Sequence, residues 1–188
     1  MTAVIRERDP RIVFPSDNYY EIGSLVAFED FAQKKMKLGK DASIKHGNRY
    51  IQLHFNSEGP VGSKAFKELS RSLAGLAQLI LRSDPMPSYV YGVTNAHMAK
   101  ASERYGFSTV RFPTNDEEFQ RSLVSSTVFS ARYKKRKQTE NIESWITYQS
   151  AEQFVKRFDP AKTGVKPADV LYSTPITRLV RAHLRLEV

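Results

Sequence analysis

The stretch 89–107 constrains the fold most, because it carries start and stop signals for two successive elements. Tyr89 to Thr94 is rich in aromatic and β-branched residues and predicts a strand. Asn95 is a favoured N-cap, and Ala96 to Tyr105 consists mostly of helix-forming residues. Gly106 can adopt the left-handed conformation that ends a helix, and the phenylalanine after it can pack back on that helix. The sequence therefore predicts a strand followed directly by a short helix.

The residues on either side extend this unit into a larger α/β arrangement. Arg49 to Phe55 alternates apolar and polar residues, which predicts a strand with one buried face. Ala65 to Arg82 has apolar residues at spacings of three and four, which predicts a long helix. Ser108 to Phe112 predicts another short strand. We therefore expect an α/β fold with a mixed sheet.

Further elements are predicted with weaker patterns. Tyr19 to Leu38 has a partial apolar face and a lysine-rich end, and we interpret it as a helix ended by Gly39. The alternation from Val180 to Val188 predicts a half-buried terminal strand. The remaining predicted elements are strands at Arg11–Pro15, Ser126–Tyr133 and Trp145–Gln149, and helices at Asp116–Val124 and Ala151–Phe158.

A polar loop with glycines, residues 56–64, precedes the long helix. Backbone amides at a helix start, together with the helix dipole, favour anions such as phosphate. Gly59 and Gly62 would let an anion approach the backbone, and Ser63 and Lys64 would add a hydroxyl and a charge. The loop matches neither the Walker pattern nor the dinucleotide-binding pattern. A purely structural turn is the alternative interpretation.

The order strand, loop, long helix, strand, and helix ending in Gly-Phe resembles the GNAT superfamily of N-acyltransferases. Asn95 and Gly106-Phe107 fall on the family's motif with its spacing. The resemblance implies a GNAT-like sheet with an additional C-terminal β-rich segment, and an acetyl-CoA or other acyl-CoA bound between splayed parallel strands. Relatives that make acyl-homoserine lactones or N-acyl amino acids take the acyl chain from acyl carrier protein. The cofactor-binding residues it implies are Leu53, Phe55, Asn56, Gly59, Val61, Gly62, Ser63, Lys64 and Asn95.

Acyl transfer to an amine requires a general base and a proton donor for the departing thiolate. His54, opposite Leu53 on its strand, and Glu58 in the loop are the candidate bases. Ser102 occupies the position of the family's tyrosine and is the candidate acid. The alternative is that His54 and Ser102 are ordinary packed residues, that Glu58 is a solvated loop residue, and that Asn95 is only an N-cap.

The formal net charge of +9 favours anionic partners, either nucleic acid or an acidic carrier protein. The densest basic run contains Arg132, Tyr133, Lys134, Lys135, Arg136 and Lys137. Its tyrosine could stack on a base while its neighbours hold phosphates. A solvated loop that keeps the protein soluble is the alternative. We therefore carry two hypotheses, an N-acyltransferase and a non-catalytic GNAT-like module that binds nucleic acid through its basic C-terminal part.

Several classes of protein are disfavoured by the sequence. There is no cysteine, which excludes disulfides and thiolate chemistry, and no pair of histidines has the spacing of a metal site. No apolar run is long enough to span a membrane, and we see no signal peptide. We expect a cytoplasmic protein with a GNAT-like domain at residues 1–133. Residues 134–188 would form a basic loop and a strand-rich extension packed on that domain.

Overall fold

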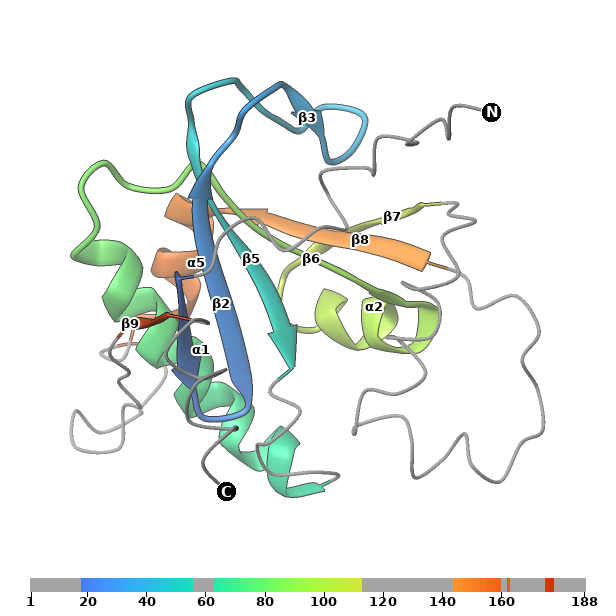
Figure 1. Cartoon of the computed structure of the whole chain (residues 1–188). Helices are drawn as coiled ribbons and strands as arrows, with labels where there is room; N and C mark the ends of the chain where they lie inside the picture. The colour runs from blue at the N-terminus through green and yellow to red at the C-terminus, as the bar shows by residue number, and fades with distance from the viewer. Residues whose placement is uncertain (1–17, 56–62, 113–143, 160–161, 163–174, 178–188) are drawn as a thin grey trace, which may run out of the picture.

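The computed structural model describes residues 18–55, 63–112, 144–159, 162 and 175–177. These residues form a mixed seven-stranded sheet with the order β7-β8-β6-β5-β2-β1-β9, together with a small two-stranded sheet (Figure 1). The large sheet contains β1 Asn18–Ile22, β2 Leu25–Phe31, β5 Arg49–Phe55, β6 Tyr89–Asn95, β7 Ser108–Arg111, β8 Ser144–Ser150 and β9 Pro175–Thr177. The small sheet contains β3 Met36–Lys37 and β4 Ser43–Ile44. The helices are α1 Ser63–Leu81, α2 Ala96–Glu103 and α5 Ala151–Phe158.

The α/β class and the mixed sheet are confirmed. β5 and β6 are parallel neighbours, whereas the other pairs of the large sheet are antiparallel. The crossover between β5 and β6 contains α1, as a parallel connection requires. The predicted strands Arg49–Phe55 and Trp145–Gln149 and the predicted helix Ala151–Phe158 are all present, with boundaries that agree to within one residue.

The predicted helix at Tyr19–Leu38 is wrong. The segment forms β1, β2 and β3, and β1 and β2 make an antiparallel hairpin in which Ile22 faces Leu25. Gly23 has a φ of 56°, the left-handed conformation that a two-residue hairpin turn requires. Aromatic and β-branched residues, which favour strands over helices, also occur throughout the hairpin.

One face of the large sheet is covered by α1 and α5. Leu69, Leu73, Leu76 and Ile80 of α1 are buried there against sheet residues that include Ile51 and Val90. Phe154 and Phe158 of α5 extend the same core, with ring centroids 4.7 Å apart. At roughly 1.5–3 kcal/mol for each fully buried large apolar side chain, this layer is a main source of stability.

The opposite face of the sheet is covered by residues 32–48, which we call the lysine lobe. Between β2 and β5 the chain leaves the large sheet, forms β3 and β4, and returns (Figure 1). The lobe inserts its apolar side chains against Tyr50, Tyr91, Val93 and Ile146 of the sheet. Those apolar side chains are Ala32, Met36, Leu38, Ala42 and Ile44.

The signals at both ends of α2 are confirmed. Asn95 Oδ1 accepts a hydrogen bond from the Met98 amide at 3.0 Å, which is N-cap geometry. Gly106 has a φ of 83°, and the Phe107 amide donates to Ser102 O at 3.3 Å. Phe107 is buried and its ring lies edge-on to Phe154. The helix itself ends at Glu103, two residues earlier than predicted, and turns continue to Gly106.

The C-terminal part of the chain contributes one inner strand and one edge strand to the large sheet. β8 lies between β7 and β6 and pairs with every residue of β6. β9 pairs with β1 at the other edge. The predicted elements at Arg11–Pro15, Asp116–Val124, Ser126–Tyr133 and Val180–Val188 lie outside the described residues.

Candidate functional site

The two parallel strands β5 and β6 separate along their length. They pair at only three positions, Tyr50 with Tyr89, Ile51 with Val90, and Gln52 with Tyr91. Each strand nevertheless continues to its end as part of the sheet. All seven residues of β5 pair with β2, and all seven residues of β6 pair with β8. Residues 53–55 of β5 and 92–95 of β6 are therefore not paired with each other, although each segment is paired with its other neighbour. We call the space between these two segments the gap.

Gly92 marks the point where the pairing stops. A Cβ atom built on Gly92 would lie 3.0 Å from the carbonyl oxygen of Leu53 and 3.6 Å from the Thr147 hydroxyl. The Gly92 carbonyl also accepts a hydrogen bond from Thr147 Oγ1 at 3.5 Å. Any side chain at this position would push against the β5 backbone at the head of the gap. Glycine therefore fits this position without displacing the β5 backbone, although glycine within a strand weakens the strand slightly.

The start of α1 lies at the same end of the sheet as this gap. α1 begins at Ser63, eight residues after β5 ends, and the helix runs back along the sheet from there (Figure 1). Its first amides lack partners within the helix, and its dipole is positive at this end. The backbone of the predicted residues Ser63 and Lys64 is thus in the first turn of α1, close in sequence to the open end of β5.

Two faces of the sheet border the gap, and they differ in chemistry. Because side chains alternate along a strand, Leu53 points to the face covered by α1, and His54 points to the opposite face. The His54 ring is half-buried and lies edge-on to Phe28, with centroids 5.6 Å apart. Gln52 and Tyr50, both buried, share its face. The fully buried Tyr91 lies beside Tyr50, with ring centroids 5.7 Å apart.

Trp145 of β8 is a residue that the sequence did not single out. It pairs with Thr94 of β6, so β6 lies between it and the gap, and among the residues that the structure describes its buried indole Nε1 has no hydrogen-bond acceptor. Trp145 and Thr147 are two residues apart on β8, so their side chains lie on the same face of the sheet. This is the face that α1 covers. A buried indole donor without a partner costs free energy, which an incoming acceptor would recover.

Two of the predicted site residues have local partners. Asn95 is buried and its Oδ1 caps α2, as described above. The Ser102 hydroxyl donates to the Ala99 carbonyl at 2.7 Å, so its proton is directed into the helix. An acid role for Ser102 would require the hydroxyl to rotate away from Ala99. The predicted cofactor contact of Asn95 and the acid role of Ser102 stay predictions.

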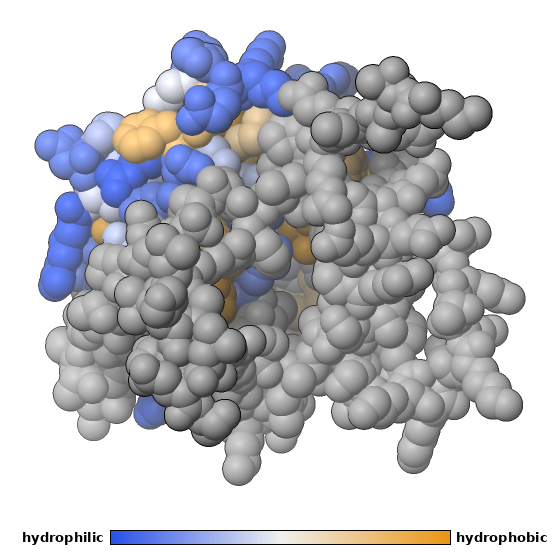
Figure 2. Space-filling model, viewed as in Figure 1, coloured by the Kyte–Doolittle hydropathy of each residue, from blue (hydrophilic) through white to orange (hydrophobic). Residues whose placement is uncertain are grey.

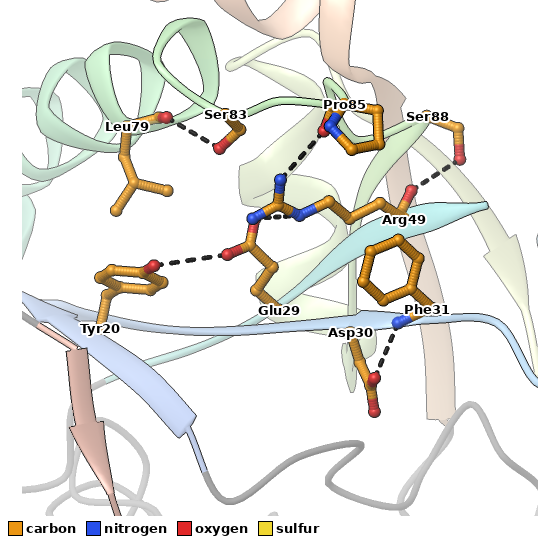
Figure 3. Close-up of polar contacts among 9 residues, drawn as sticks. All are labelled: Tyr20, Glu29, Asp30, Phe31, Arg49, Leu79, Ser83, Pro85 and Ser88. Carbon is orange, nitrogen blue, oxygen red and sulfur yellow. Dashed lines mark hydrogen bonds and ion pairs between the residues drawn. The ribbon is translucent and has the colours of Figure 1, made fainter. Parts of the chain in front are cut away.

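A partly buried ion pair lies at the other end of the sheet, near the end of α1 (Figure 3). Arg49 Nε is 2.8 Å from Glu29 Oε1, and another guanidinium nitrogen of Arg49 donates to Pro85 O at 3.1 Å. Tyr20 donates to Glu29 Oε2 at 3.4 Å. Burial, and then the negative charge of Glu29, raise the pKa of Tyr20 above its usual value. This network ties β1, β2 and β5 to the loop after α1, and we assign it a structural role.

The remaining predicted site residues lie outside the described residues, or their side chains do. Only the backbone of Phe55, Ser63 and Lys64 is described. The undescribed residues are Asn56, Glu58, Gly59, Val61 and Gly62 of the loop, and Arg132, Tyr133, Lys134, Lys135, Arg136 and Lys137 of the basic run.

Comparisons of the chain with protein-family models, with curated proteins and with solved structures find no match. In the part of the chain that the structure describes, no helix has the length and apolar character needed to cross a membrane. Within the same residues, no three histidine, aspartate or glutamate side chains are grouped as a metal site would need.

Proposed function

We propose that the protein is an N-acyltransferase that moves an acyl group from a coenzyme A or carrier-protein thioester to an amine. The observation that carries the proposal is the gap between β5 and β6, where residues 53–55 and 92–95 are paired along their outer edges only. Beyond Gln52 and Tyr91, the backbone amides and carbonyls that face the gap are not paired between β5 and β6, so an extended ligand could bind them. The pantetheine arm of the thioester has amides of its own and can complete the missing ladder.

The start of α1 supports the same assignment. A diphosphate at this helix terminus would meet free amides and a positive dipole. Ser63 and Lys64 stand in the first turn, where the predicted loop would complete the anion site. A thioester entering between β5 and β6 would then have its phosphates beside α1 and its reactive carbon further into the gap.

The chemistry would take place at the level of Leu53 and His54. The amine attacks the thioester carbonyl, and a backbone amide of β5 donates to the developing oxyanion. The acceptor amine loses a proton, for which His54 is the candidate base, and the bond to sulfur breaks with release of the thiol. Trp145, which faces the same side of the sheet as Leu53, is a candidate hydrogen-bond donor, because its buried Nε1 has no acceptor among the described residues.

A thermal-shift experiment with acetyl-CoA tests the binding step. A ligand at about 100 times its Kd stabilises the folded state by about 2.7 kcal/mol, which for a chain of this length is a rise of about 5–10 °C in Tm. The variant Gly92→Ala places a Cβ against Leu53 O. We expect it to lose most of this rise.

Gly39→Ala is the matched control. A Cβ at Gly39 would collide with the Tyr148 ring beneath the lysine lobe, away from the gap. Overpacking should destabilise the free form of both variants by about 1–3 kcal/mol and so lower its Tm, but only Gly92→Ala should abolish the response to ligand. An absent shift in the wild-type protein at millimolar acetyl-CoA, or an undiminished shift in Gly92→Ala, would overturn the proposal.

A further inference from the structure

The lysine lobe carries a concentrated positive charge on an anchored surface. Its seventeen residues, 32–48, contain five lysines and one acidic residue, Asp41. All five lysine side chains, those of Lys34, Lys35, Lys37, Lys40 and Lys45, are exposed. Figure 2 shows hydrophilic side chains gathered at the end of the molecule where Figure 1 places β3. The basic run identified in the sequence, 132–137, is a different segment.

The lobe is held in one conformation by both its backbone and its core. The Ala32 amide donates to Asn48 O at 2.9 Å, and the Gly47 amide donates to Ala32 O at 2.8 Å, which closes the base of the lobe. At its tip, the Leu38 amide donates to Ala42 O at 2.9 Å. The inward side chains are buried, so the lysines project outward from a fixed support. Their positions are therefore set before any partner binds.

The exposed lysines of the lobe are not part of the proposed acyl-donor site, whereas its buried apolar side chains share a core cluster with Val93 beside the gap. It ends at Asn48, immediately before β5 begins, whereas the gap opens at the far end of β5. In Figure 1 the lobe and the start of α1 are at opposite ends of the sheet. The charge on the lobe is therefore not needed to bind a donor in the gap. We therefore expect the lysines to bind a different ligand.

We infer that the lysine lobe binds the phosphate backbone of nucleic acid, without sequence preference. The exposed side chains of residues 33–48 are polar or charged, and none is apolar. Protein–protein interfaces, in contrast, centre on aromatic and apolar anchors and are depleted in lysine. Lysines alone provide point charges for phosphates and contribute little to reading bases. The inference does not depend on the proposed acyl transfer.

The test measures the binding of a fluorescein-labelled 20-base-pair DNA duplex by anisotropy between 50 and 200 mM salt. The lobe variant replaces Lys35, Lys40 and Lys45 with glutamine. If each contacts a phosphate, we expect the variant to bind at least about tenfold more weakly, and the slope of log K against log salt to fall by about 2.7.

The control variant removes the same charge elsewhere. It replaces Lys100 of α2, Lys156 of α5 and Lys162 with glutamine, all of which are exposed lysines of other elements. It should bind the duplex within about twofold of the wild-type protein, and circular dichroism melts should show that both variants fold.

An equal loss of affinity in the two variants would mean that DNA is attracted to the basic protein in general. An unchanged affinity in the lobe variant would mean that DNA binds at a different site. If poly-glutamate displaced the duplex when added at the same total charge as the DNA, the partner of the lobe would be an acidic protein instead. Each of these three results overturns the inference.

Discussion

At the scale of single residues, Asn95 and Gly106 act through near neighbours in the chain, whereas Gly92 contacts a residue of another strand. The capping role of Asn95 and the left-handed Gly106 follow from neighbours within a few residues, and both are confirmed. The steric preference for glycine at position 92 depends on the carbonyl of Leu53, which lies on another strand. Trp145 was missed for the same reason, because its neighbour Thr94 is distant in sequence.

Tyr50 gives a prediction about stability at high pH. Burial, and then the negative charge of Asp30 on the facing strand, raise the pKa of Tyr50 above its usual value of 10.0. The unfolded chain therefore ionises this tyrosine at a lower pH than the folded protein does. The contribution that the neutral Tyr50 makes to the free energy of unfolding is complete below pH 10. It is lost progressively as the pH rises above 10, at up to about 1.4 kcal/mol per pH unit.

Urea unfolding between pH 9 and pH 12 measures this dependence. Tyr50→Phe removes the ionisable group, so the free energy of unfolding of the variant should fall less steeply above pH 10. Tyr20, whose pKa is also raised, should keep contributing in both proteins. Parallel pH profiles for the wild-type protein and Tyr50→Phe would contradict the assignment.

At the scale of elements, the sequence predicted regular amphipathic segments well and the first hairpin badly. Apolar residues recur with a period of two in β5 and of about 3.6 in α1. The strand and the helix that these periods predict are both confirmed. In 19–38, apolar residues happen to fall at helical spacings, but the left-handed Gly23 makes the turn between β1 and β2. The lysines that were interpreted as a helix end instead cover the outside of the lobe.

The junction of β6 and α2 allows the two interpretations of Asn95 to be separated. Asn95→Ala removes the cap and should destabilise the protein by about 1 kcal/mol. Asn95→Asp keeps a capping oxygen and places a negative charge at the helix start, so stability should be retained. If the amide of Asn95 also contacts the acyl donor, Asn95→Asp should nevertheless reduce the thermal shift with acetyl-CoA. An undiminished shift in this variant would leave Asn95 as a cap only.

At the scale of the whole molecule, the sheet is continuous outside the gap. Both strands that border the gap are supported by antiparallel partners, and the two cores on either face hold those partners in place. The separation of β5 and β6 is therefore built into the fold and does not need a ligand to create it. The sequence suggested such a gap only through a family resemblance. The residues at which 49–55 and 89–95 stop pairing depend on how the whole chain folds, and no local pattern in either segment indicates them.

Amide hydrogen exchange tests the central claim most directly, because it reports on the inner edges of β5 and β6. Without ligand, the inward-facing amides of 53–55 and 92–95 should exchange much faster than those of the paired residues 50–52. With saturating coenzyme A they should slow at least about tenfold, as the missing ladder is completed. Equal protection along the whole of β5 without ligand, or no change when coenzyme A is added, would contradict the account.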